Sequence, residues 1–186
     1  MANTTAAFGL RPLGKVDGNP APGGQSPYRI FDNASTSVYQ GDLVGLGTSG
    51  TVVPVTSSAT TTILGVFNGC LIDVSPTTGK PTWKNFYVQT DVAQGLINAY
   101  VIDDPNQLYL VRSTNTALGN TALGTSYGIK HAAGSSVTGL SGVYMDLGAT
   151  TTAQLRPTSV SPFIGNEEAV LNEEFVVKIR STSSIL

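Results

Sequence analysis

Turn residues divide this sequence into many short apolar runs, and this punctuation constrains the fold more than any other feature. The chain contains 21 glycines and 10 prolines among 186 residues. No long window repeats apolar residues every 3.6 positions, as an amphipathic helix would. β-Branched residues dominate the apolar runs, and such residues favour strands over helices. The sequence therefore predicts a mainly β protein.

Several short strands are predicted, each bounded by turn signals. Thr48-Ser49-Gly50 separates the runs Val38 to Leu46 and Thr51 to Val55, which indicates a hairpin. Asn68-Gly69 interrupts a longer run and indicates a bulge or bend. Many short strands separated by turns predict a small β-barrel or a β-sandwich. Further runs that we expect to form strands lie at 83–88, 99–102, 108–112, 142–147, 153–156 and 174–180.

Two segments between these runs carry local signals of their own. Asp103-Asp104-Pro105-Asn106 is a strong turn sequence and separates the runs 99–102 and 108–112. The best helix candidate is Asn166 to Glu173, where acidic pairs bracket three apolar residues. We expect a short helix there at most.

The first part of the chain differs from the rest. Residues 1–37 are rich in Gly, Pro, Asn and Ala, and four prolines in this segment would break a helix or remove a donor from a sheet. Its large apolar residues are too scattered for one helix face or a long strand. We therefore expect an extended N-terminal arm over 1–37, held by a neighbouring chain, and a β body over 38–186.

Composition excludes several classes of function. The formal net charge is −2, so no overall attraction to nucleic acid or to an anionic membrane is expected. Only 12% of residues are charged, against about 25% in an average soluble domain, which suits close packing against neighbours. No apolar run is long enough to span a membrane, and the N-terminus does not resemble a signal peptide. With Cys70 as the single cysteine, no intrachain disulfide or Cys/His zinc pattern is possible.

One motif matches a catalytic pattern. Gly124-Thr125-Ser126-Tyr127-Gly128 has the G-x-S-x-G spacing of a nucleophile elbow. That elbow requires a strand-to-helix turn, followed later in the chain by an acid and a histidine. The single histidine, His131, lies where the helix of the elbow would run, so the motif is interpreted as a turn and no catalytic residue is assigned.

Acidic residues offer no better site. Asp103 and Asp104 lack the spacing of a calcium loop and are ordinary turn residues. Glu167, Glu168, Glu173 and Glu174 are interpreted as a solvated acidic edge or as a patch that meets a basic neighbour. Gly79-Lys80 lacks the rest of a phosphate-binding loop. We therefore expect no metal, no cofactor and no enzymatic activity.

Aromatic residues leave a binding alternative open. Trp83, Tyr87, Tyr100 and Tyr109 lie on predicted strands and could line a carbohydrate groove. The simpler interpretation is that they pack a core or an interface. A carbohydrate-binding β module therefore remains one hypothesis.

Short motifs along the whole chain resemble one protein family. The opening Ala6-Ala7-Phe8-Gly9-Leu10-Arg11-Pro12, followed by Gly14, resembles the start of a family of small tailed-phage virion proteins, the capsid decoration or cement proteins. The further motifs that match in order are Gly41-Asp42-Leu43-Val44, Ile63-Leu64-Gly65-Val66, Tyr87-Val88, Asp103-Asp104-Pro105 and Val176-Val177-Lys178-Ile179.

The resemblance implies a structural role in the virion. Such proteins sit on the outer surface of the expanded head, often as homotrimers, and stabilise it by contacts with the major capsid protein. The protein would be made in the host cytoplasm, and the resemblance supplies no catalytic residue. A neck, tail or fibre component of the virion is the alternative.

The arm offers candidates for the contact with a neighbour. Phe8, Leu10 and Arg11 carry the large side chains of an otherwise small-residue segment. Aromatic and arginine side chains are frequent hot spots of protein interfaces. We expect these three residues to be anchors of an arm that adds a strand to a neighbouring sheet.

Overall fold

The structure is a computed structural model of the chain. It describes residues 3, 5–19, 24–30, 34, 36–56, 62–75, 77–88, 97–114, 116–150, 153–163 and 165–180.

Strands account for nearly all the regular structure of the described residues. One short 3₁₀ turn, Gly119–Ala122, joins them. The strands are β1 (Arg11–Lys15), β2 (Ser26–Ile30), β3 (Val38–Tyr39), β4 (Leu43–Leu46), β5 (Val52–Pro54), β6 (Ile63–Ile72), β7 (Thr82–Lys84), β8 (Phe86–Tyr87), β9 (Ile97–Ile102), β10 (Gln107–Arg112), β11 (Gly128–Lys130), β12 (Tyr144–Asp146), β13 (Leu155–Val160) and β14 (Glu174–Ile179).

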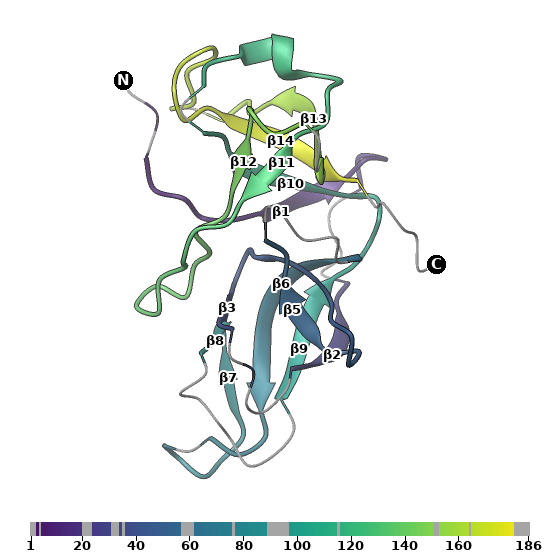
Figure 1. Cartoon of the computed structure of the whole chain (residues 1–186), viewed down its shortest axis with the longest axis vertical. Helices are drawn as coiled ribbons and strands as arrows, with labels where there is room; N and C mark the ends of the chain where they lie inside the picture. The colour runs from purple at the N-terminus through teal and green to yellow at the C-terminus, as the bar shows by residue number, and fades with distance from the viewer. Residues whose placement is uncertain are drawn as a thin grey trace.

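The strands form two lobes stacked along the long axis of the molecule (Figure 1). The upper lobe holds a sheet of order β1-β10-β14-β13 and the hairpin β11-β12. The lower lobe holds a sheet of order β2-β9-β6-β4-β5, with β7 also paired to β6, and the small pair β3-β8. All pairings between named strands are antiparallel.

Each lobe buries its apolar side chains between its larger sheet and its two-stranded ribbon. In the upper lobe, Ile129 and Met145 of the ribbon pack with Phe175 and Val177 of β14. In the lower lobe, side chains of β3 and β8 pack with those of β6 and β9. The alternation of buried positions along β9 is that of a strand with one covered face. Each lobe is therefore a small two-layer β structure.

The upper core continues across the boundary between the lobes. Leu10, Leu43, Val66 and Ile102 belong to the same buried cluster as the strands of the upper sheet. Leu43 pairs with Val66, and Val66 pairs with Ile102, so one end of the lower sheet faces the upper lobe. We call this region the lobe junction.

Several predictions from the sequence are confirmed. The chain is mainly β and consistent with a β-sandwich, and the described strands form open sheets rather than a closed barrel. The predicted hairpin is β4-β5, whose turn contains Gly50 with a positive φ of 71°. The predicted bulge is a register shift between Phe67 and Gly69 in the pairing of β6 with β9.

The expected separation of an arm from a body is wrong for the described part of residues 1–37. β1 pairs with β10 in the upper sheet, and β2 pairs with β9 in the lower sheet. Near the start of the chain, the Asn3 side chain exchanges hydrogen bonds with the backbone of Glu167. The segment therefore belongs to the body and ties its two lobes together. Residues 1, 2, 4, 20–23, 31–33 and 35 of the expected arm lie outside the described residues.

One further expectation is wrong, and one is confirmed. The residues 166–173 form turns and not a helix, with positive φ at Ala169 and Asn172. The predicted turn at 103–106 is present, since the Gln107 backbone N–H donates to the Asp104 carbonyl at 3.1 Å. It leads from the lower sheet, which contains β9, to the upper sheet, which contains β10.

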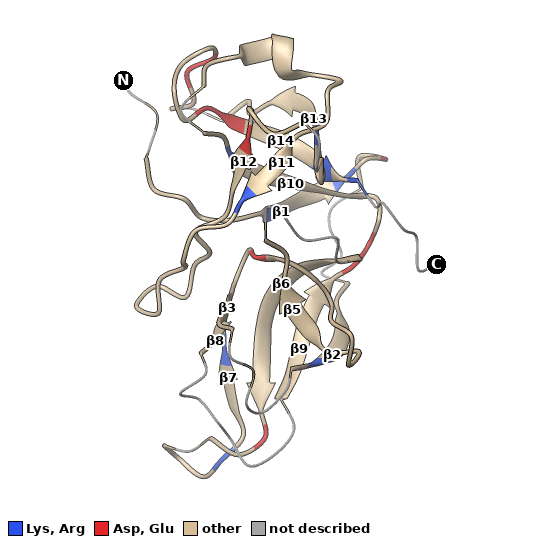
Figure 2. Ribbon diagram, in the orientation of Figure 1, with Lys and Arg blue, Asp and Glu red and all other residues tan. Residues whose placement is uncertain are grey.

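Charged residues are sparse on both lobes, and most of the ribbon in Figure 2 carries neither sign. Among the described residues, no helix is long and apolar enough to cross a membrane.

Candidate interaction site at the lobe junction

Gly9 sets the path of the chain into the lobe junction. It has a φ of 72°, and a Cβ atom at this position would lie 2.6 Å from the Gly41 carbonyl oxygen and from the Ser141 Cβ. The next residue, Leu10, donates its backbone N–H to the same Gly41 oxygen at 2.8 Å. Only glycine fits both the backbone conformation and the space, so this turn depends on the residue type.

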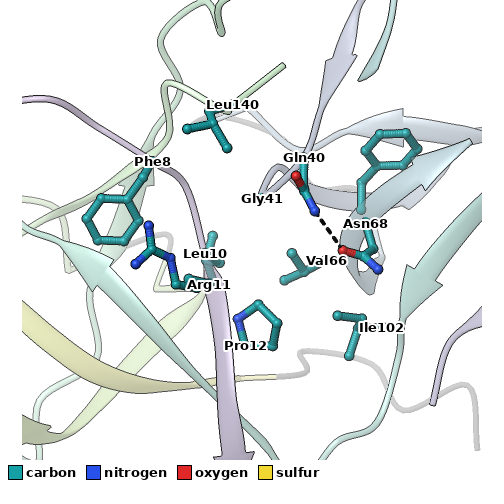
Figure 3. A pocket seen from close by; sticks show the side chains of 11 residues that line it. Phe8, Leu10, Arg11, Pro12, Gln40, Gly41, Val66, Asn68, Ile102 and Leu140 are labelled. Atoms are coloured by element: carbon teal, nitrogen blue, oxygen red, sulfur yellow. Dashed lines mark hydrogen bonds between the residues drawn. The ribbon is translucent and has the colours of Figure 1, made fainter. Parts of the chain in front are cut away.

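A pocket of about 130 Å³ opens beside this turn (Figure 3). Its apolar wall includes Pro12 of β1, Val66 of β6, Ile102 of β9 and Leu140 from the loop 131–143. Its polar side includes Gln40, whose amide nitrogen donates to the Asn68 side-chain oxygen at 3.0 Å. Strands of both lobes therefore contribute to one small cavity.

The three residues predicted as arm anchors all line this pocket, but they differ in exposure. Leu10 is 1% exposed and belongs to the core, so its predicted role as an anchor to a neighbour is wrong. Arg11 is exposed, and its guanidinium carbon lies 4.8 Å from the centroid of the half-buried Phe8 ring. Phe8 and Arg11 thus form a cation–π pair at the mouth of the pocket.

A buried carboxylate lies beneath the pocket. Asp42 is completely buried and accepts hydrogen bonds from the Tyr39 backbone N–H at 2.7 Å and from the Ser141 hydroxyl at 2.5 Å. Burial raises the pKa of Asp42, although both hydrogen bonds favour the charged form. The Ser141 oxygen in turn accepts the Val143 N–H at 2.9 Å, so Asp42 fixes the end of the loop 131–143 against the lobe junction.

His131 begins this loop, and its Coulombic interaction with Asp42 favours the charged form of that carboxyl and lowers the pKa of Asp42. The Nε2 atom of His131 is buried and has no hydrogen-bond partner among the described residues. Ser141 is bonded to Asp42 and not to the imidazole, and it is 1% exposed. The three side chains therefore form a structural cluster, without the nucleophile-to-base hydrogen bond that acyl-transfer chemistry requires.

The pocket has the size and the walls for one side chain. Ligand sites for drug-sized molecules occupy about 300–1,000 Å³. A cavity of about 150 Å³ holds a single benzene ring. The volume of about 130 Å³ therefore suits an apolar side chain from another protein, with the Phe8–Arg11 pair at its edge.

The nucleophile-elbow motif does not form an elbow. Ser126 leads into the strand β11, not into a helix, and Tyr127 forms an isolated bridge with Leu155. The Tyr127 backbone N–H donates to the Leu155 carbonyl at 2.7 Å. The motif serves as a connection between the ribbon and the edge of the upper sheet.

The acidic turn after β9 has structural partners. Asp103 accepts a hydrogen bond from the Tyr28 hydroxyl at 2.8 Å, and burial together with this carboxylate raises the pKa of Tyr28 to about 12. Asp104 pairs with Lys15 at 2.7 Å, and this hydrogen bond lowers the pKa of Asp104. The two carboxylates join β9 to β2 and to β1, so the turn connects the lobes.

The interpretation of the four glutamates as a solvated edge is wrong for Glu173. This side chain is completely buried, and its two carboxylate oxygens accept the backbone N–H groups of Gly119 and Ala169. Glu168 accepts hydrogen bonds from the backbone and the side chain of Asn120. These two glutamates hold the 3₁₀ turn against the turn 166–173.

The fold separates the four aromatic residues that could have lined a carbohydrate groove. Tyr87 and Tyr109 are buried, so neither lines a surface groove. Trp83 is 49% exposed, and its ring centroid lies 5.2 Å from that of Tyr100 at an angle of 49°. The Trp83 ring also covers Gly69, where a Cβ atom would lie 2.5 Å from the indole. One aromatic pair remains at the surface of the lower sheet.

The burial of two charged side chains was not predicted from the sequence. Asp42 belongs to a quoted motif, but its burial follows from the lobe junction, which is a long-range feature. Arg112 ends the apolar strand β10 and is only 8% exposed. The sequence feature that could have indicated its burial is the position of this arginine at the end of an apolar run.

The described part of the chain contains no group of three or more His, Cys, Asp or Glu side chains that could hold a metal ion. Comparisons of the chain with protein-family models, with curated proteins and with solved structures give no match.

Proposed function

We propose that this chain is a structural protein that binds other protein chains, and that it decorates and stabilises the outer surface of an expanded tailed-phage head. The observation that carries the proposal is the convergence of the family-like motifs in space. The Leu10 backbone N–H donates a hydrogen bond to the Gly41 carbonyl, and Leu43 lies opposite Val66 in the pairing of β4 with β6. The backbone of Gly65 packs closely against that of Ile102, next to Asp103. Motifs that are separate in the sequence thus belong to one structural unit, as a shared fold requires.

The surface supports a role in packing against several neighbours. Large apolar side chains are exposed on both lobes, at Trp83, Leu171 and, most fully, Val137 at 93%. They lie on separate segments of the chain, which carries few charges that would have to be desolvated. Several modest contacts, repeated by symmetry, give tight association.

The proposed partners are the major capsid protein and further copies of this chain in a homotrimer. Contact through an added strand is less favoured than the sequence suggested, because β1 already pairs with β10 of its own chain. We place the main contact at the Phe8–Arg11 pair and the pocket beside it, where a side chain of the capsid protein enters.

Co-sedimentation with expanded heads that lack the protein tests this function, with unexpanded heads as the control. We expect saturable binding to expanded heads alone, at a fixed ratio to capsid subunits. The double variant Phe8→Ala and Arg11→Ala should weaken binding at least about fivefold, as loss of interface hot spots does. A truncation is unsuitable, because removal of residues 1–11 would also remove Leu10 from the core.

A matched control is Phe163→Ala, which removes another half-exposed aromatic side chain away from the pocket. Equal losses for Phe163→Ala and the double variant would contradict the assigned contact. Absence of binding to both kinds of head would contradict the decoration role and favour a neck or tail component.

A carbohydrate-binding role is the second candidate, favoured by the surface pair Trp83–Tyr100. Aromatic rings with one exposed face are suited to stacking on sugars. A glycan screen with the wild type and Trp83→Ala separates this candidate from the first, because only this candidate predicts binding that the substitution abolishes.

A further inference from the structure

Arg112 is a buried cation with an incomplete set of partners. Its side chain lies at the end of β10 and is 8% exposed. The Nη1 atom donates to the Asn172 side-chain oxygen at 2.6 Å, and the guanidinium carbon lies 5.4 Å from the centroid of the Tyr144 ring. The Nε–H group is buried and has no acceptor among the described residues.

No carboxylate of the described residues neutralises this guanidinium. Glu174 lies opposite Arg112 in the ladder of β10 and β14, yet the two side chains form no ion pair. Desolvation lowers the pKa of Arg112, because burial removes the water that stabilises the charged guanidinium. Buried charges in proteins are normally paired, because an unpaired one strongly destabilises the folded state.

A polar pocket of about 320 Å³ adjoins Arg112. Its lining includes a second cation, Lys130 of β11, and the side chains of Thr114 and Thr116. One carboxylate, Asp146 of β12, also lines it and accepts the Gly148 N–H at 2.9 Å. Two cations against one carboxylate leave the pocket with one net positive charge.

We propose that this pocket binds a carboxylate, in the form of an acidic side chain of a protein partner. The planar guanidinium matches the two oxygens of a carboxylate, and the Lys130 ammonium and the threonine hydroxyls supply further donors. A carboxylate carries the single negative charge that the pocket lacks. A phosphate dianion would exceed that charge and would face Asp146 as well.

The pocket lies in the upper lobe, away from the Phe8–Arg11 site, and shares no residue with it. Its assignment therefore stands independently of the decoration role, and the isolated protein suffices to test it. The probe is butyrate, a monoanion that presents the carboxylate of a glutamate side chain, titrated at constant ionic strength. The readouts are the NMR signals of the Arg112 Nε–H group and of the Lys130 backbone amide.

We expect both signals to shift in a saturable manner. Lys130→Gln should weaken the binding about threefold, since its ammonium is exposed to solvent. Arg112→Gln should abolish it, and Lys130→Gln carries the test if Arg112→Gln does not fold. Lys80→Gln, which removes an exposed lysine from the lower lobe, should leave the affinity unchanged.

The titration is repeated with inorganic phosphate. Tighter binding of phosphate than of butyrate would overturn the assignment of a carboxylate. Shifts that do not saturate, or an equal affinity in Lys130→Gln and in the wild type, would overturn the site itself.

Discussion

Gly9 shows how a single residue type fixes the lobe junction. Its positive φ of 72° and the atoms of Gly41 and Ser141 around it exclude any side chain. Gly41 is its counterpart, with a φ of 94° and a Cβ position 2.9 Å from the Phe8 carbonyl oxygen. The two backbones approach closely only because neither residue has a side chain, and this approach places Leu10 in the core.

The substitution Gly9→Ala should therefore destabilise the protein strongly. The left-handed conformation costs an alanine about 1–2 kcal/mol, and the collision with backbone atoms adds about 1–3 kcal/mol. Urea unfolding of the variant and the wild type measures the sum as a loss in the free energy of unfolding.

Gly18→Ala is the matched control. Gly18 has a similar φ of 80°, but a Cβ atom there meets nothing within 4 Å. This variant should lose only the conformational part, about 1–2 kcal/mol. Equal losses at the two positions would contradict the close approach at Gly9.

At the level of strands, proline protects the open edges of the sheets. In the two larger sheets, each strand that ends the sheet path contains one proline, whereas the inner strands β4, β6, β9, β10 and β14 contain none. A proline has no N–H group to offer to an incoming strand, and proteins use it on edges to prevent aggregation. The four residues are Pro12 in β1, Pro27 in β2, Pro54 in β5 and Pro157 in β13.

Replacement of an edge proline should increase self-association without a large change in stability. Pro27 is exposed, so Pro27→Val leaves the core intact and should change the free energy of unfolding by no more than about 0.5 kcal/mol. It restores an N–H donor to the edge of β2. Light scattering at increasing protein concentration measures the association.

Arg29→Val controls for the added apolar surface. Arg29 is exposed on the same strand, two positions further and hence on the same face, but its N–H group is already present. If Arg29→Val associates as strongly as Pro27→Val, hydrophobicity and not the missing donor limits association.

The same strands show what the sequence could and could not predict. Local signals sufficed for the hairpin β4-β5 and for the bulge in β6. The strands β1 and β2 were missed as strands because Pro12 and Pro27 weaken the signal at an edge, where proline is tolerated. The turn 103–106 was recognised from its residues, but its flanking strands join different sheets, since a turn sequence specifies a reversal and not a pairing partner.

The candidate site, too, could be predicted from local signals but not in its long-range contacts. Large side chains in a small-residue segment marked Phe8, Leu10 and Arg11 as anchors, and all three line one pocket. Whether an anchor faces its own core or a neighbour depends on the partner strands, and so Leu10 was misplaced. Arg112 was missed because its burial results from Asn172 and Tyr144, which are distant in the sequence.

At the scale of the whole molecule, the shared core should make the two lobes unfold together. The cluster that contains Phe175 and Val177 of the upper sheet also contains Leu43 and Val66 of the lower sheet. Exposure of one lobe would therefore open the core of the other, and we expect a single cooperative transition.

Two probes test this expectation. Trp83 is the single tryptophan of the chain and lies in the lower lobe, so its fluorescence reports on that lobe. The amide signals of β14 report on the upper lobe. Coincident urea midpoints are expected, and separate midpoints would show that the lobes unfold independently.

The pairing of the first strands with late partners also has a consequence for synthesis on the ribosome. Arg11 of β1 pairs with Leu110, and Ser26 of β2 pairs with Val101. Both early strands must wait until those residues have left the exit tunnel, and β10 then waits for β14. At about 5–20 residues per second, the nascent chain carries unpaired β segments for several seconds. The edge prolines in β1 and β2 would protect it from neighbouring nascent chains over that interval.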